Sequence, residues 1–73
     1  MATFGERLRK CRELAGLSMR FLDRSCQELS GKQWSGRVYQ LETGRIPDPR
    51  ISSILLLAKI LRVPPAMLLP EEM

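Results

Sequence analysis

The chain has 73 residues, of which 44% are hydrophobic and 27% are charged. This length allows one domain with a modest core, and the composition is too apolar for a disordered protein. The formal net charge is +4: residues 1–50 hold ten of the twelve Lys and Arg against six acids, and residues 51–73 are neutral. A basic part followed by a neutral apolar part favours a polyanion-binding surface beside a core or self-association surface. An ordinary solvated positive surface is the alternative.

The chain lacks the residues that several classes of function require. The chain contains no histidine, which excludes imidazole acid–base chemistry and histidine metal ligands. Cys11 and Cys26 fall on predicted apolar helix faces and are typical of core thiols rather than of a zinc pair. No phosphate-loop motif occurs, so we expect no enzymatic activity, cofactor or metal. With no signal peptide or membrane-spanning run, we expect a cytoplasmic protein with both thiols free.

The first two predicted helices have start and stop signals. Thr3 and Glu6 have the spacing of a capping box, and Gly16 follows the last helical position. Ser18 is a candidate cap for the second helix, and Gly31 is its candidate stop. One apolar stripe is predicted along the second helix, consisting of Phe21, Leu22, Ser25, Cys26 and Leu29.

The third predicted helix is short. Residues 32–34 are predicted as a loop and Ser35 as the cap of the helix, which is apolar at Val38 and Leu41 and stops at Gly44. Its opposite side is polar and a basic residue follows its end, which is what an element that reads a DNA groove needs.

Prolines separate the remaining elements. Asp48 is the predicted cap and Pro49 the first residue of a fourth helix, which is strongly apolar from Ile51 to Leu61. A short fifth turn follows Pro64 and Pro65, carries residues 67–69, and ends at Pro70. No strand alternation or internal repeat is present, so we expect an all-α fold of five short helices.

The chain resembles the lambda-repressor-like (Cro/XRE-type) family of helix-turn-helix DNA-binding proteins. The matching segments occur in the family's order and cover nearly the whole chain: residues 12–18, Leu22, Val38, residues 41–45, Pro49, residues 54–63 and residues 68–69. The resemblance implies that residues 1–73 form one compact five-helix DNA-binding domain, with the third helix in the major groove.

The N-terminal end of such a helix faces base edges. The candidate base-reading residues are Trp34, Ser35, Gly36, Arg37 and Gln40. Gln40 has the amide geometry for a bidentate contact to adenine, while Arg37 can read guanine or bind a phosphate. For Trp34 two interpretations stay open: a contact at the DNA interface, or an anchor that pins the loop to the core. Tyr39 is equally open between a groove contact and a wall of the core.

Phosphate contacts are expected from two helix ends and from the preceding loop. The candidates are Ser18, Met19 and Arg20 at the start of the second helix, Lys32 and Gln33 in the loop, and Thr43 and Arg45 after the third helix. The resemblance also implies that Arg12 pairs with Glu42 and tethers the third helix to the first. Two exposed charges are the alternative.

The sequence departs from the family between the second and third helices. The spacing from Leu22 to Leu41 is several residues longer than is usual, so the connection of these helices is lengthened. Asp23 stands where the family has a small residue, and Gln27 stands where it has the glycine of the tight turn.

The apolar C-terminal part predicts self-association. Leu56, Ile60, Met67 and Leu69 are candidates for an exposed strip that forms a homodimer, or they merely deepen the core. We therefore expect a sequence-specific regulator of transcription, a repressor, that binds double-stranded DNA at a near-palindromic operator without a small-molecule effector. The alternative is an antitoxin or adaptor that uses the same fold to bind a protein.

Overall fold

The first helix begins as its sequence predicts. The computed structural model describes residues 3–69, and α1 covers Phe4–Leu14. The backbone N–H of Thr3 donates to Glu6 Oε1 at 2.9 Å, and that of Glu6 donates to Thr3 Oγ1 at 3.2 Å, which completes the capping box. Phe4, Leu8 and Cys11 form the buried face of α1.

Helix α2 covers Met19–Ser30, and the predicted signals stand at both of its ends. Ser18 Oγ accepts the N–H of Phe21 at 3.0 Å, and Gly31 closes the helix in the left-handed conformation at φ 71°. The predicted apolar stripe is too wide, because Phe21 and Leu29 are more than half exposed. Only the line through Leu22 and Cys26 is buried, since that side alone faces α3 and α4.

Helix α3 covers Arg37–Glu42 and begins later than predicted. Gly36, at φ 74°, is its N-cap instead of Ser35, and no side chain at the cap bonds the first amides. Asp23 of α2 takes that role: its Oδ2 accepts the N–H of Gly36 at 3.0 Å and its Oδ1 accepts that of Val38 at 2.9 Å. A carboxylate from a neighbouring helix thus replaces the local cap.

Helix α4 covers Ile51–Leu61, so the prediction of Asp48 as cap and Pro49 as first residue is wrong. The backbone is still extended at Arg50, with φ −74° and ψ 150°, and the helix can begin only after it. The predicted fifth helix is a single 3-10 turn, η1, at Pro65–Met67. Pro70, its predicted end, lies outside the described residues. Residues 3–69 therefore contain four α-helices and one 3-10 turn, and no strand.

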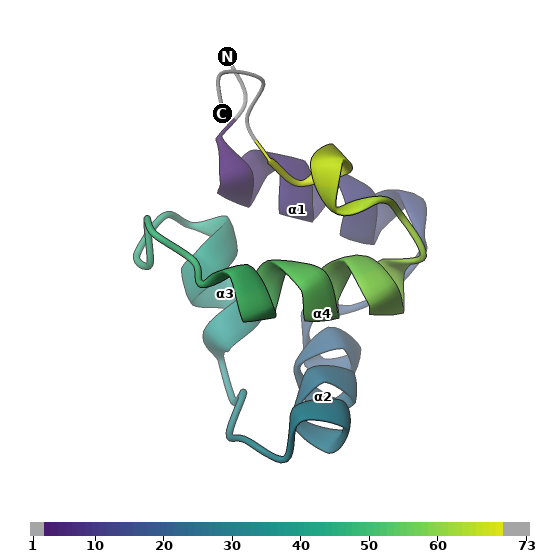
Figure 1. The fold of residues 1–73 in the computed structure, drawn as a ribbon, viewed down its shortest axis with the longest axis vertical. Coiled ribbons are helices and arrows are strands. Elements are labelled where there is room, and N and C mark those ends of the chain that lie inside the picture. Colours follow the sequence, from purple (N-terminus) through teal and green to yellow (C-terminus); the bar gives the residue numbers. More distant parts are fainter. Residues whose placement is uncertain (1–2, 70–73) are drawn as a thin grey trace.

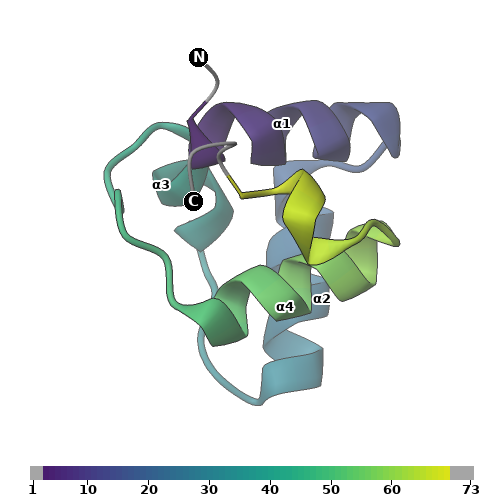
Figure 2. The same cartoon turned by 45° about the horizontal axis from the view of Figure 1, so that its top comes forward.

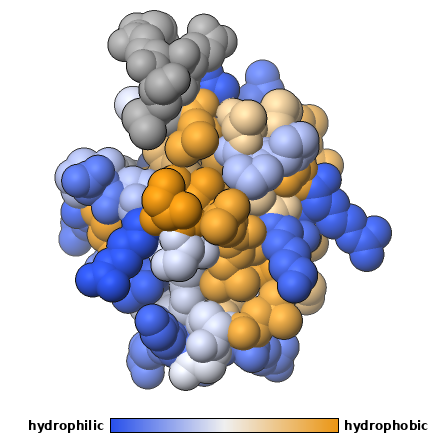
Figure 3. Space-filling model, viewed as in Figure 1, coloured by the Kyte–Doolittle hydropathy of each residue, from blue (hydrophilic) through white to orange (hydrophobic). Residues whose placement is uncertain are grey.

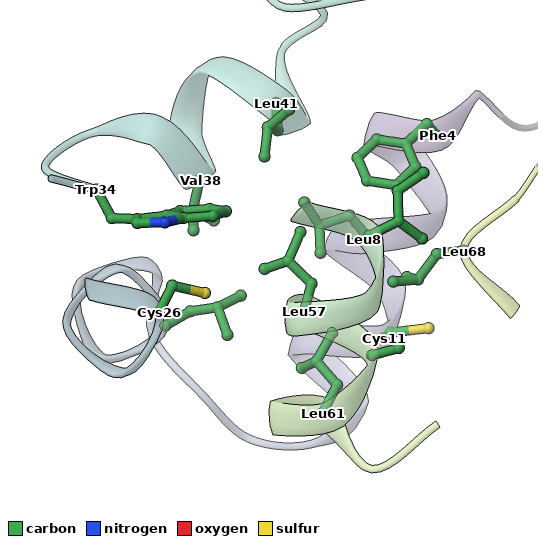
Figure 4. Close-up of a cluster of buried hydrophobic side chains, with 13 residues drawn as sticks. Phe4, Leu8, Cys11, Cys26, Trp34, Val38, Leu41, Leu57, Leu61 and Leu68 are labelled. Atoms are coloured by element: carbon green, nitrogen blue, oxygen red, sulfur yellow. The ribbon is translucent and has the colours of Figure 1, made fainter. Parts of the chain in front are cut away.

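The helices enclose one core. Figure 1 shows α4 crossing the middle of the molecule, with α1 and η1 above it, α2 below it and α3 at one side. The turned view in Figure 2 separates α1 from α4 and shows η1 between them. Side chains from every helix meet in the centre (Figure 4). The core residues are Phe4, Leu8, Cys11, Leu22, Cys26, Trp34, Val38, Leu41, Ile54, Leu57, Ala58, Leu61 and Leu68.

Helices α1 and α3 approach closely at Gly5. A Cβ at this position would stand 2.6 Å from the carbonyl oxygens of both Leu41 and Glu42. Only glycine lets the start of α1 lie against the end of α3 at this separation. Within the described part of the chain, none of the helices is long and apolar enough to cross a membrane.

Candidate nucleic-acid interface

Helix α3 buries one side and exposes the other. Val38 and Leu41 are buried, whereas Tyr39 and Gln40 are exposed. Helical periodicity places Gly36 and Thr43 on the same outer side as these two residues. We call Gly36, Tyr39, Gln40 and Thr43 the reading face. Tyr39 is about half exposed, which favours a surface position over a wall of the core, and Gln40 is exposed beside it.

An ion pair holds the C-terminal end of α3 to α1. Arg12 Nε donates to Glu42 Oε2 at 2.6 Å, and Nη2 donates to Oε1 at 3.2 Å. Arg12 Nη1 also donates to the carbonyl of Leu17 at 2.9 Å. The pair is nearly inaccessible to solvent, and the hydrogen bond to Glu42 raises the pKa of Arg12. The structure thus contains the tether that the family resemblance implies, in its buried form.

A groove between α2 and the start of α3 borders one edge of the reading face. This α2–α3 groove is formed by Arg20, Asp23, Arg24, Gln27, Ser35 and Gly36. Arg20 and Arg24 are one helical turn apart and both are exposed, so two guanidinium groups stand beside the N-terminal end of α3. Ser35 and Gly36, two of the predicted base-reading residues, therefore share a surface with Arg20, a predicted phosphate contact.

A second basic surface lies beyond Arg37. A cavity between the loop at residues 31–36 and the start of α4 is lined by Lys32, Trp34, Arg37, Arg50 and neighbouring residues, with Asp48 as its one acid. Arg37 Cζ lies 5.1 Å from the centroid of the Trp34 ring, a cation–π contact that holds the guanidinium to the side of α3. Of the two roles predicted for Arg37, this position favours phosphate over guanine.

Trp34 is part of the core, so its prediction as a base-reading residue is wrong. Its side chain is only 2% exposed and lies near Val38 and Cys26 in Figure 4. The N–H of Trp34 donates to Gln27 Oε1 at 3.3 Å, a second link from the loop to α2. The lengthened connection buries its indole because this is the largest apolar surface available to pin the loop.

The residues predicted to contact phosphate differ in their exposure and in whether their donor groups are already hydrogen-bonded. Arg20, Lys32, Gln33 and Arg45 are exposed. Met19 is half-buried and packs its side chain against the core, so its side chain is a poor phosphate contact. Ser18 Oγ already caps α2, and the Thr43 hydroxyl donates to the carbonyl of Tyr39 at 2.8 Å instead of serving as a free donor. The arginines and Lys32 remain the strongest candidates.

Sequence reasoning missed three residues of these surfaces, namely Arg24, Gln27 and Arg50. Arg24 had a signal, because it follows Arg20 by one helical turn. Arg50 had none, since the expected helix start at Asp48 placed it inside α4. Gln27 had no local signal either, because its partner Trp34 is seven positions away.

The predicted dimer residues are less exposed than expected. Leu56, Ile60 and Leu69 are half-buried against the core, whereas Met67 is about half exposed. The most exposed apolar side chains of α4 are Ile51 at 66% and Leu55 at 52%, which sequence reasoning did not single out. Figure 3 shows apolar side chains gathered over the middle of this face, with hydrophilic ones at its edges.

Both cysteines are buried and unpaired by disulfide. Burial, reinforced by the nearby carboxylate of Asp23, raises the pKa of the Cys26 thiol to about 12. Among residues 3–69, no group of three His, Cys, Asp or Glu is placed to hold a metal ion.

No protein-family model, curated protein or solved structure matches this chain. The geometry of α3 and its two basic borders therefore carries the functional argument.

Proposed function

We propose that this protein is a sequence-specific regulator of transcription that inserts α3 into the major groove of double-stranded DNA. The observation that carries the proposal is the reading face: an exposed polar side of a helix with basic residues along both borders. An α-helix fits the major groove, and an amide such as that of Gln40 pairs with adenine through two hydrogen bonds.

The rigid attachment of α3 supports this proposal. The helix is only six residues long, and an isolated helix of that length is not stable in water. Gly5 and the Arg12–Glu42 pair fix its C-terminal end, and Asp23 fixes its start. A short helix held at both ends can present its side chains in one geometry, which sequence discrimination requires.

The two basic borders would bind the phosphates on either side of the groove. Arg20 and Arg24 form one border, and Lys32, Arg37 and Arg50 form the other. Such contacts set the register of a protein on DNA without reading sequence. A repressor that acts by occupying a promoter needs only this binding.

We extend the proposal to a homodimer joined through the exposed apolar side of α4. Ile51 and Leu55 are the main apolar surface there, with half-buried Leu56 and Ile60 beside them. A two-fold dimer would bind a near-palindromic operator. The same apolar surface is the observation that favours the second candidate, an antitoxin or adaptor that docks a different protein.

The test is selection of bound duplexes from a random pool, followed by titration of the best duplex and a scrambled one across salt. We expect a palindromic sequence bound about 10³-fold more tightly than scrambled DNA, or better. In Gln40→Ala this discrimination should fall, while binding to scrambled DNA stays unchanged. Equal and steeply salt-dependent binding of both duplexes by the wild type would contradict the proposal and leave phosphate attraction alone.

A further inference from the structure

Asp23 is the one acidic residue of the α2–α3 groove. It stands one turn inside α2, and its two carboxylate oxygens each accept an N–H from the start of α3, at Gly36 and Val38. These amides are 13 and 15 positions away in the chain. A small residue at this position could form neither bond.

The two bonds fix the direction of α3. A hydrogen-bonded turn from Trp34 to Arg37 leads into α3, and Gly36 has no side chain to act as a cap. A carboxylate that accepts from two amides, one on either side of Arg37, holds both the position and the tilt of a helix start. Asp23 therefore holds the start of α3 directly to α2, while Gln27 of the same helix holds Trp34 just before it.

The negative charge of Asp23 also lies at the start of α3. The Asp23 carboxylate already accepts the amides of Gly36 and Val38, and its negative charge repels other anions from the start of α3. Arg20 and Arg24 flank Asp23 and remain exposed for phosphate. On DNA, this arrangement would hold phosphates beside Arg20 and Arg24 at the edge of the groove and leave the start of α3 for base edges.

We propose that Asp23 is a specificity-determining residue, which positions α3 for base contact and keeps phosphate away from its start. The inference rests on the proposed function, because it concerns how the same surface distinguishes one DNA sequence from another. Disfavouring the wrong ligand is a recognised route to specificity, distinct from strengthening the right one.

The test compares Asp23→Ala and Asp23→Asn on the selected and the scrambled duplex. Asp23→Ala removes both bonds and the charge, so affinity for the selected duplex should fall about tenfold, as for loss of a typical cap, while the scrambled duplex binds about threefold more tightly. Asp23→Asn keeps the shape and one acceptor, so it should gain equally on scrambled DNA and lose less on the selected duplex.

Glu28→Ala is the matched control. It removes the same unit of negative charge from an exposed position of α2 that lines neither the α2–α3 groove nor the cavity beyond Arg37. Both duplexes should then bind slightly more tightly, with their ratio unchanged. If Asp23→Ala instead lowers the affinity for both duplexes by the same factor, in proportion to the unfolded fraction, the role of Asp23 is purely structural and the inference is overturned. An unchanged ratio in both Asp23 variants would overturn it as well.

Hydrogen exchange separates this inference from the proposed function. In the free protein, Asp23→Ala should speed amide exchange at Gly36 and Val38 but not in the middle of α4. If the wild type fails to discriminate between duplexes, the proposed function and the specificity role both fall, and exchange alone reports whether Asp23 positions α3. Unchanged exchange at both amides would refute the positioning role.

Discussion

Arg12 satisfies three acceptors with one guanidinium: both oxygens of Glu42 and the carbonyl of Leu17. Arg12→Ala should lower the free energy of unfolding by about 3–5 kcal/mol, because it leaves the Glu42 carboxylate buried without a partner. Urea denaturation would measure this loss. Arg9→Ala is the control, since its ion pair with Glu13 is exposed and should contribute less than about 1 kcal/mol. Equal losses in the two variants would contradict the tether.

The Cys26 thiol predicts how stability changes in alkali. Its pKa is raised to about 12 in the folded protein, so the unfolded chain loses the thiol proton first as pH rises. The stabilising effect is complete below the ordinary cysteine pKa and is lost progressively between there and pH 12. In this range the Cys26 thiol should lower the free energy of unfolding by up to about 1.4 kcal/mol for each pH unit.

Denaturation at pH 8, 9 and 10 would measure this fall in the wild type and in Cys26→Ala. Because the two proteins share every other residue, the difference between them isolates the contribution of the thiol. A wild type whose stability falls no more steeply than that of the variant would contradict the prediction.

At the scale of elements, the contact of α1 with α3 depends on Gly5. Gly5→Ala should destabilise the protein by about 1–3 kcal/mol, because the new methyl group would collide with the carbonyls of Leu41 and Glu42. This sign is the opposite of what helix propensity predicts, since alanine is the better helix former. Thermal denaturation would measure it, with Ser52→Ala on the exposed start of α4 as a control that stays near wild type. A stabilised Gly5→Ala would show that the helices can separate without cost.

The helices were predictable where the signals are local. The capping box at Thr3, the cap at Ser18 and the stop at Gly31 all stand where short-range backbone chemistry puts them. The start of α3 was not predictable, because its cap comes from Asp23 in another helix. The start of α4 was misjudged because Asp48 and Pro49 satisfy the sequence pattern while the backbone at Arg50 stays extended.

The candidate site was predictable to the same degree. The outer residues of α3, and the basic residues before and after it, follow from helical spacing and charge. The role of Trp34 did not follow, because an aromatic residue in a polar loop reads equally well as a contact or as an anchor. Only its burial in the structure decides between them.

At the scale of the whole molecule, the exposed leucine of α4 tests the homodimer. Leu55→Lys should shift the protein to a monomer, because a charge would be placed in an apolar interface at little cost to the monomer's own core. Sedimentation at concentrations where the wild type dimerises would measure this. Leu14→Lys is the matched control, since Leu14 is exposed at the end of α1 and does not belong to the apolar side of α4, so the dimer should stay intact. A monomeric wild type would remove the dimer from the proposal.

The hydrogen bonds between α2 and the segment that connects it to α3 do not involve the backbone between Lys32 and Gln33. Ser30 bonds Lys32, Gln27 bonds Trp34, and Asp23 bonds Gly36 and Val38. Extra residues inserted between Lys32 and Gln33 would break none of these bonds and would add only a small loop-closure entropy. The segment between α2 and α3 can therefore change length, during evolution or by engineering, while α3 keeps its orientation relative to α2.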